Sequence, residues 1–444
     1  MFELALGCVG LIFESQRVPL TDIALLNRDT INPKKIKHNV VNHYSLPSWP
    51  ELEPDRVSPS TIKSNKIILP NECVLVSRLN PKLHKTWRVS VNDSEMSIAS
   101  TEWAVLTPRN GICIEYLFAV VSDVSFQEQL KSMVTGTSAS HQRVRPEDIL
   151  IAKIPRFDSI SEKQIGLLFS GIRRLSRRKK IEFGLYNQIC IALFKSWFID
   201  FNPVNELAEG RKPFGIDDET AALFSDEFEE SPLGLIPMGW EICPLEDVIS
   251  ISRGLSYKAT FLSKEEGIPF HTANSVLEGG GYKFDGIKYY TGEYNQRHII
   301  RPNDIIVATL EQSFDHALVG HVARIPSIYG DEGIYSGDLF KIHPISEKVT
   351  RNWIFSLLNS EKMHRTIIQY SNGTTINRIP QDSLKRPLVV IPPRNIIDAF
   401  DNIVTPIHQL CDQNISTINK ISALRDDLLP LLITGLLGVG GVKG

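Results

Sequence analysis

The residues of this chain whose types could do chemistry are basic, amide and hydroxyl side chains that follow two similar stretches of sequence. Arg, Lys, Asn and Gln are the residue types that hydrogen-bond to the edges of DNA bases. Taken singly, any one of these residues is more simply explained by ordinary surface polarity, so the functional interpretation rests on the pattern they share. The candidates in the first stretch are Arg78, Asn80, Lys82, Lys85, Arg88, Ser138, His141 and Arg143. The candidates in the second are Arg253, Ser256, Tyr257, Lys258, Gln312, His316, Thr375, Asn377 and Arg378.

A basic run is the sharpest local charge feature. It holds six cations within eight residues, in a stretch whose formal net charge over residues 151–202 is +6, although the whole chain carries only −3. Such a cluster can neutralise DNA phosphates, and it can equally contact an acidic partner protein or form a solvated helix face. The cations are Arg173, Arg174, Arg177, Arg178, Lys179 and Lys180.

Catalytic signatures are missing. The chain has no Gly-x-x-x-x-Gly-Lys-Ser/Thr loop for a nucleoside triphosphate and no Gly-rich fingerprint that follows a strand and opens a helix. Asn80-Pro81 and Asn202-Pro203 lack the aromatic residue that a base-methylating Asn-Pro-Pro-aromatic motif requires. The eleven histidines show no metal-ligand spacing. We therefore expect a chain that is not itself an enzyme and that binds no metal or cofactor of its own.

The framework around the candidate residues occurs twice, about 237 residues apart. Gly136-Thr137-Ser138 leads to Ile154-Pro155, and Gly373-Thr374-Thr375 leads to Ile391-Pro392 at the same spacing. Further matches are Ser100–Pro108 with Ser336–Pro344, Pro70–Glu72 with Pro302–Asp304, and Val18–Ile23 with Cys243–Val248. The polar residues that follow these motifs differ between the copies. Like frameworks with unlike polar residues indicate two modules that recognise different halves of a two-part target.

Each repeat is predicted to be a mixed α/β unit, since short β-rich runs bounded by Pro and Asn alternate with a short helical stretch near 116–130 and 353–368. Six scattered cysteines without a Cys-x-x-Cys pair fit a reducing cytoplasm, and no segment reaches the ~18 apolar residues of a membrane span. The predicted domains are a first globular domain at 1–155, a helix at 156–202, an acidic linker at 203–235, a second globular domain at 236–393, a helix at 394–437 and a flexible tail at 438–444.

Two long helices follow the repeats. Apolar residues recur at spacings of three and four in both, which predicts one apolar seam along each helix. The first seam runs through Ile165, Leu168, Ile172, Leu175, Lys179, Glu182, Tyr186, Ile189, Leu193 and Ser196. The second runs through Ile397, Phe400, Val404, Ile407, Cys411, Asn414, Ile418, Ile421, Arg425 and Leu428. We expect the helices to pack against each other, antiparallel; the alternative is that each covers only its own domain.

At this point the sequence resembles a known family. Residues 192–204, Ala208–Arg211, Glu219–Phe224 and Ile236–Trp240 resemble the central conserved region of the specificity subunit of type I restriction–modification systems, and Leu424–Pro430 with Thr434-Gly435 is similar to the family's distal conserved region. The chain departs from the common pattern near its N-terminus, where no opening like Pro237-Met238-Gly239-Trp240 is found.

The resemblance implies two pseudo-twofold-related target recognition domains separated by two long antiparallel coiled-coil-like helices. Each domain would read one half of a bipartite site in double-stranded DNA, and the helices would set the spacer. The chain would carry two methyltransferase (modification) subunits and then restriction/translocase subunits, in the cytoplasm. S-adenosylmethionine, ATP and Mg would be bound by those partners. Two alternatives remain: a DNA methyltransferase with its own catalytic domain, and a coiled-coil scaffold that does not bind DNA.

Overall fold

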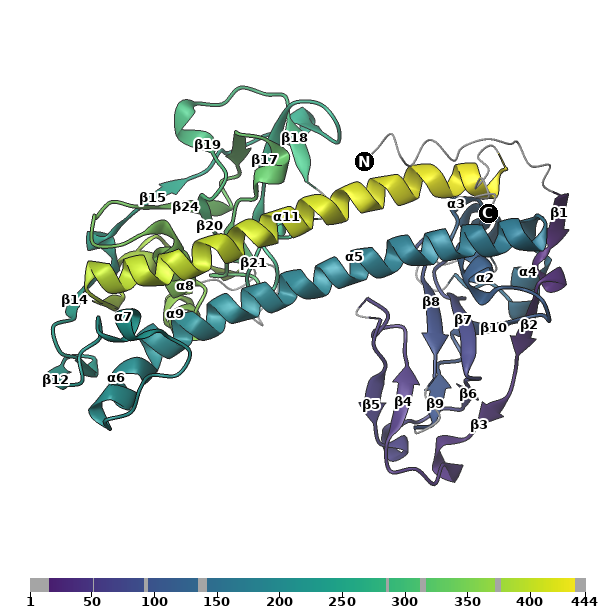
Figure 1. Ribbon diagram of the computed structural model, residues 1–444. Coiled ribbons are helices and arrows are strands. Elements are labelled where there is room, and N and C mark those ends of the chain that lie inside the picture. Colours follow the sequence, from purple (N-terminus) through teal and green to yellow (C-terminus); the bar gives the residue numbers. More distant parts are fainter. Residues whose placement is uncertain are drawn as a thin grey trace, which may run out of the picture. The chain divides into compact units, whose positions relative to one another are not determined.

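The computed structural model describes residues 16–50, 52–91, 95–134, 142–284, 287–311, 317–371 and 377–435 (Figure 1). The chain divides into two compact units. The first unit comprises residues 1–178 and 418–444, and the second comprises residues 179–417. Both long helices therefore contribute to both units. Within the described part of the chain, no helix combines the length and apolar character needed to cross a membrane.

The first unit is built from short strands and three short helices. Its strands are β1 Gln16–Pro19, β2 Ala24–Asn27, β3 Thr30–Ile31, β4 Val41–Tyr44, β5 Asp55–Val57, β6 Lys66–Ile68, β7 Glu72–Ser77, β8 Thr86–Ser90, β9 Ser97–Ala99, β10 Trp103–Pro108 and β11 Lys153–Arg156. Its helices are α2 Ile114–Val121, α3 Val124–Ser132 and α4 Pro146–Ile151. The strands form a four-stranded sheet in the order β2-β10-β7-β8, a five-stranded sheet in the order β3-β6-β9-β4-β5, and the antiparallel pair β1-β11.

The second unit repeats this plan. Its strands are β12 Phe228–Ser231, β13 Gly234–Pro237, β14 Glu241–Pro244, β15 Ile249–Arg253, β16 Leu262–Ser263, β17 Ile268–His271, β18 Lys288–Tyr290, β19 Ile299–Ile300, β20 Ile305–Ala308, β21 Leu310–Glu311, β22 Val322–Arg324, β23 Gly333–Tyr335, β24 Leu339–Pro344, β25 Asn377–Arg378 and β26 Leu388–Ile391. Its short helices are α6 Asn202–Ala208, α7 Asp218–Ala221, α8 Arg351–Leu358, α9 Glu361–Ile368 and α10 Asp382–Lys385.

The sheets of the two units share one topology. The order β15-β24-β20-β22 matches β2-β10-β7-β8 strand for strand, and β14-β26 matches β1-β11. In the five-stranded sheets the parallel pair β4-β9 corresponds to β17-β23. The fifth strand is added at opposite ends, since β3 pairs with β6 whereas β16 pairs with β18. The predicted mixed α/β repeat is thus confirmed, with one strand placed differently in each copy.

Each predicted short helical stretch consists of two helices. Asp123 accepts a hydrogen bond from the Ser125 amide at 2.7 Å and begins α3, and Ser360 accepts one from the Met363 amide at 3.3 Å and begins α9. An N-cap side chain of this kind starts a new helix because it satisfies an amide that has no partner in the preceding turn. The two caps lie at matching positions of the repeat, so the break between the helices is part of the repeated design.

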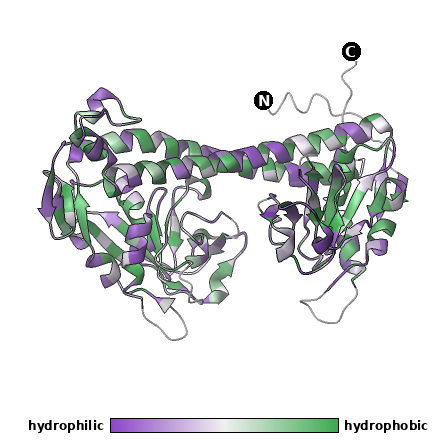
Figure 2. Ribbon diagram, turned by 90° about the horizontal axis from the view of Figure 1, so that it is seen from below, coloured by the Kyte–Doolittle hydropathy of each residue, from purple (hydrophilic) through white to green (hydrophobic). Residues whose placement is uncertain are grey.

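The two long helices are α5, Ser159–Phe194, and α11, Arg394–Ile433. In the first unit the start of α5 shares a buried core with the end of α11, through Ile165, Phe169 and Leu432. In the second unit the end of α5 shares a core with the start of α11, where the rings of Phe194 and Phe400 lie 5.8 Å apart. The antiparallel packing is therefore confirmed within each unit (Figure 1). Both helices carry hydrophobic and hydrophilic residues along their length (Figure 2).

The predicted seam holds for α11 but is wrong in part for α5. Ile397, Phe400 and Val404 are fully buried. Leu168, Leu175 and Ile189 of the α5 seam are instead 38%, 45% and 49% exposed. The reason is that α5 also packs against its own domains, so Phe169 and Phe194 set its buried face. Its contact with α2 is so close that a Cβ on Gly166 would lie 2.4 Å from the amide nitrogen of Tyr116.

The ends of the central helix also differ from the prediction. We expected this helix to end at Pro203, but the α-helix ends at Phe194, and a π-helical segment, Lys195–Ile199, continues to the left-handed residue Phe201. Pro203 lies instead in the first turn of α6. The predicted acidic linker holds α6, α7 and the hairpin β12-β13, and Val204 and Phe224 are buried in the core of the second unit. The predicted domain boundaries stay predictions, because the compact units divide inside the long helices.

Candidate nucleic-acid interface

In the first unit, three segments that are distant in sequence converge at the end of strand β7. The main chain of Leu79 pairs with that of Arg143, and the amide of Asn80 donates to Gln142 O at 2.9 Å. Arg78 connects both segments to the turn before β10, since its amide donates to Glu102 O at 2.9 Å and its Nη1 donates to Thr101 O at 2.8 Å. These are the turn residues that the sequence repeat marked.

Side chains strengthen this junction. Arg78 Nε donates to Val144 O at 3.3 Å, and Arg143 Nη2 donates to Glu102 Oε1 at 2.8 Å, with the Arg143 side chain 54% exposed. Asn80 has a φ of 48° and opens a tight turn in which the Leu83 amide donates to Asn80 O at 2.9 Å. An asparagine tolerates this left-handed conformation better than most residues. Lys82 is exposed in the same turn. The structure thus brings Arg78, Asn80, Lys82 and Arg143 to one place.

The second unit contains the same junction. Strand β21 pairs with β25, with Leu310 opposite Arg378 and Glu311 opposite Asn377. The Thr309 amide donates to Asp338 O at 3.0 Å, which corresponds to the Arg78–Glu102 bond of the first unit. Arg253 reaches the same turn, because its Nε donates to Gly337 O at 3.0 Å. Arg378 is exposed beside it.

Several predicted site residues lie away from these junctions. Lys85 lies over the ring of Trp49 at 5.5 Å. Arg88 is in strand β8 and forms ion pairs with Glu72 at 2.7 Å and Glu115 at 3.3 Å. Tyr257 packs on Phe270, and its neighbours Ser256 and Lys258 are exposed. The predicted residues Ser138, His141, Gln312, His316 and Thr375 lie outside the described residues, as do the repeated Gly-Thr pairs and the side chain of Asn377.

The basic run is divided between different environments. Arg173 stacks over Phe118 at 4.7 Å and Phe169 at 5.6 Å, and burial together with nearby Arg425 lowers its pKa to about 10. Arg177 Nη2 lies 3.4 Å from Glu53 Oε1, and Lys179 Nζ lies 2.7 Å from Glu182 Oε2. Arg174, Arg178 and Lys180 are exposed. Arg173 is therefore a packing residue of the first unit and not a member of one continuous cationic face.

Comparison with known proteins agrees with this geometry. Residues 237–422 match the type I restriction modification DNA specificity domain. The chain carries such a specificity domain. It is 23% identical over 348 residues to the MjaIX specificity subunit of Methanocaldococcus jannaschii, covering 75% of this chain and 71% of that protein. It is 22% identical over 395 residues to the HindI specificity subunit of Haemophilus influenzae, covering 78% and 82%.

The fold is also that of a solved specificity subunit. A crystal structure of the S subunit from M. genitalium superimposes with a TM-score of 0.60 at 10% identity, over 96% of this chain and 97% of that one. The predicted fold is thereby confirmed, and the domain match over residues 237–422 supports the predicted family and its DNA-specificity role.

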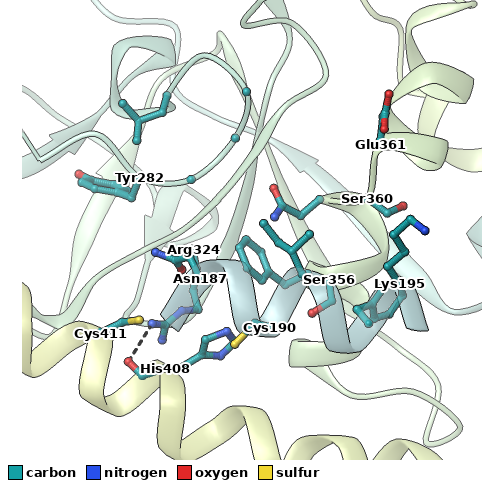
Figure 3. Close-up of a pocket in the computed structure, with 18 of the residues that line it drawn as sticks. Asn187, Cys190, Lys195, Tyr282, Arg324, Ser356, Ser360, Glu361, His408 and Cys411 are labelled. Atoms are coloured by element: carbon teal, nitrogen blue, oxygen red, sulfur yellow. Dashed lines mark hydrogen bonds between the residues drawn. The ribbon is translucent and has the colours of Figure 1, made fainter. Parts of the chain in front are cut away.

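The second unit also holds a cavity of about 580 Å³ (Figure 3). It lies between α5, α11 and the second domain, where Arg324 Nη2 donates to Asp412 Oδ1 at 2.9 Å and to His408 O at 3.4 Å. Burial raises the pKa of the Cys190 thiol to about 11 and that of the Cys411 thiol to about 12. Both cysteines are therefore neutral thiols and not nucleophiles at pH 7.

The imidazole of His408 also lines this cavity. Burial, followed by the charge of Arg324, lowers the pKa of His408 to about 4. Among the described residues, no group of three or more His, Cys, Asp or Glu side chains could hold a metal ion. The cavity is therefore lined by apolar side chains, by these neutral groups and by charged residues such as Arg324, Lys195 and Glu361.

The sequence interpretation missed residues that hold the junctions together. Glu102 and Asp338 supply equivalent carbonyls, yet neither was singled out as a site residue. The available signal was the repeat itself, since both residues belong to the matched motif that precedes β10 and β24. The residues that match between the two copies form the frame of the junction. The polar residues that differ between the copies are the candidates for contact with a target.

The stability of the second unit is expected to depend on pH through His321. Burial, and then the neighbouring His364, lowers the pKa of His321 from 6.5 to about 4, while Glu311 acts weakly in the opposite direction. The folded state therefore binds this proton less readily than the unfolded state. The contribution of the neutral imidazole to stability is fully present above about pH 6.5 and is lost as the pH falls toward 4.

Chemical unfolding of the full chain at pH 7, 6 and 5 tests this expectation. The free energy of unfolding of His321→Gln should fall less steeply with acidification than that of the wild type, and the exposed control His343→Gln should follow the wild type. Parallel slopes for all three proteins would contradict the assignment.

Proposed function

We propose that this chain reads a bipartite DNA sequence, with each globular domain contacting one half-site. The observation that carries this proposal is the duplicated junction of three segments. In both domains the segment after the central strand and the segment before α4 or α10 are joined by main-chain pairing, beside exposed arginines such as Arg143 and Arg378. Guanidinium groups held on a rigid frame are suited to bidentate hydrogen bonding with guanine.

Two different half-sites follow from the differences between the junctions. The first domain presents Asn80, Lys82 and Arg143, and the second presents Arg253 and Arg378 on an equivalent frame. Main-chain geometry is conserved between the two copies while the side chains change. Such an arrangement gives two domains the same approach to DNA and a different base preference.

We also propose that the chain assembles with two modification subunits and with restriction subunits through α5. Apolar residues on this helix are unusually exposed for a packed helix: Ile181, Leu185, Ile189 and Ile191 are each between 49% and 52% exposed. Exposed apolar patches of this kind mark protein contacts. In this scheme S-adenosylmethionine, ATP and Mg belong to the partners, and the assembly works in the cytoplasm.

The half-site assignment is tested by changing Asn377 and Arg378 together to Ala. Each good bidentate contact with a base contributes about 1–3 kcal/mol of discrimination, so preference at some positions of the second half-site should weaken about tenfold or more. Binding to DNA libraries randomised in one half-site at a time measures this. The control is Arg386→Ala, which removes an exposed arginine paired with Asp382 on α10. Unchanged preference across second half-sites would exclude these two residues as readers.

The spacer between the half-sites is expected to depend on helix length, since α5 and α11 each run from one unit into the other. An insertion of seven residues adds about two turns, or roughly 10 Å, to an α-helix. Inserting it in α5 alone should abolish or shift the spacer found by mapping methylated sites in cells. The same insertion between Lys212 and Pro213, which lie outside the helices, is the control. If the variant with the α5 insertion kept full activity and an unchanged spacer, the helices would not set the spacer.

The docking role of α5 is tested with Leu185→Asp and Ile189→Asp. Both side chains are about half exposed, so a charge there should leave the thermal midpoint of the free chain within a few degrees. Co-purification of the modification subunit should fall at least tenfold if this face is buried in the complex. Gln188→Asp, on the same helix, is the matched control. Full recovery of the partner with both variants would place the contact elsewhere.

A further inference from the structure

The helix pair braces residues that follow the central strand in both domains: these are residues 78–85 in the first domain and, among the described residues, 317–321 in the second. In the first domain, Gln127 of α3 donates from Nε2 to Lys82 O at 3.0 Å and more weakly to Pro81 O at 3.4 Å. In the second domain, His364 of α9 donates from Nε2 to Val319 O at 3.0 Å. Gln127 and His364 lie 237 residues apart, the same offset as the sequence repeat.

A second pair of residues obeys the same offset. His84 and His321 each stand just before the strand that ends the segment, again 237 residues apart. His84 Nε2 donates to Val121 O, the last residue of α2, at 2.8 Å. The ring of His321 stacks on that of His364 with centroids 3.7 Å apart and an interplanar angle of 15°. In both domains one histidine of the segment and one side chain of the second helix therefore fasten the segment to the helix pair.

The brace in the second domain has a further component. Glu311 is only 6% exposed, and its Oε2 accepts hydrogen bonds from the amides of Leu318 and Val319, both at 3.1 Å. The carbonyl of Val319 therefore accepts a hydrogen bond from His364, while its amide donates one to Glu311. Next to it, Gly320 has a φ of +81°, and a Cβ there would lie 3.3 Å from His364 Cδ2. The main chain of 318–320 is held from two sides in a conformation that a larger residue would strain.

We propose that Gln127 and His364 are the residues that position the two DNA-reading segments, each acting on its own half-site. Neither is expected to touch DNA. Each donates one N–H to a main-chain carbonyl of a segment whose other end joins the reading junction, through Asn80 in the first domain and Glu311 in the second. The inference rests on the proposed function, because it assigns each segment to one half of the DNA site.

The equivalence of the two positions gives a sharp test. Gln and His can both donate an N–H at this place, so exchanging them, Gln127→His and His364→Gln, should preserve the brace. Gln127→Ala and His364→Ala remove it. Controls on the same helices are Gln129→Ala, whose side chain bonds Lys153 and not the segment, and Arg365→Ala, whose exposed side chain pairs with Glu361.

The experiment measures the full chain with its modification subunit on DNA libraries in which one half-site at a time is randomised. We expect Gln127→Ala to lower discrimination in one half-site by roughly 2- to 10-fold, the worth of one hydrogen bond, and to leave the other half-site unchanged. His364→Ala should do the converse. The exchanged variants should behave as the wild type, and the thermal midpoints of all variants should be recorded to separate positioning from loss of fold.

Each outcome decides something. If both alanine variants keep wild-type discrimination in both half-sites, the positioning role is wrong. Equal loss in both half-sites, or loss that only follows the thermal midpoint, also overturns it. If the wild-type chain itself shows no preference for a two-part site, the proposed function fails. If the wild type reads two half-sites and the alanine variants read them equally well, only the positioning role fails.

Discussion

Burial of aromatic rings between the long helices and the globular domains is the interaction on which the rest of the structure depends. In the second unit, Phe194 and Phe198 meet Phe400 and Trp353, with ring centroids between 5.2 and 6.2 Å apart. In the first unit, Phe169 of α5 meets Phe118 of α2 at 5.6 Å. Aromatic pairs in this range stabilise by more than their buried area alone. Since α2 and α8 begin the helix pairs that hold the reading segments, this packing fixes the segments relative to the helices within each unit.

Much of this architecture could be predicted from the sequence because it follows from repetition and from periodicity. The matched motifs located the strand ends, the turns before β10 and β24, and the start of each helix pair. The α11 seam was predicted residue by residue, since this helix buries one continuous stripe. The α5 seam could not be, because Phe169 and Phe194 compete with Leu168 and Ile189 for burial, and only the tertiary contacts decide which face turns inward.

The sequence predicted which segments lie side by side, but not which side chains meet there. Arg78 and Arg88 are the same residue type and lie ten positions apart, yet Arg78 joins three segments while Arg88 is held in ion pairs with Glu72 and Glu115. Strand position decides this difference, and residue type does not. Arg173 shows the same limit, since a cation in a basic run became part of an aromatic packing layer. Such contacts depend on residues that are distant in the sequence, and a single sequence does not show which of them lie close together in the fold.

The helix pairs and the junctions hold the reading segments largely at main-chain atoms of those segments. Gln127 holds the carbonyl of Lys82, His364 holds that of Val319, and the junctions are closed by amide-to-carbonyl pairing. Main-chain groups are the same in nearly every residue, so side chains along these segments, apart from His84, Glu311 and His321, can be exchanged without loosening the attachment. In evolutionary terms, such a chain can acquire a new recognition sequence by point substitution in one domain while its scaffold, its partners and its other domain stay as they were.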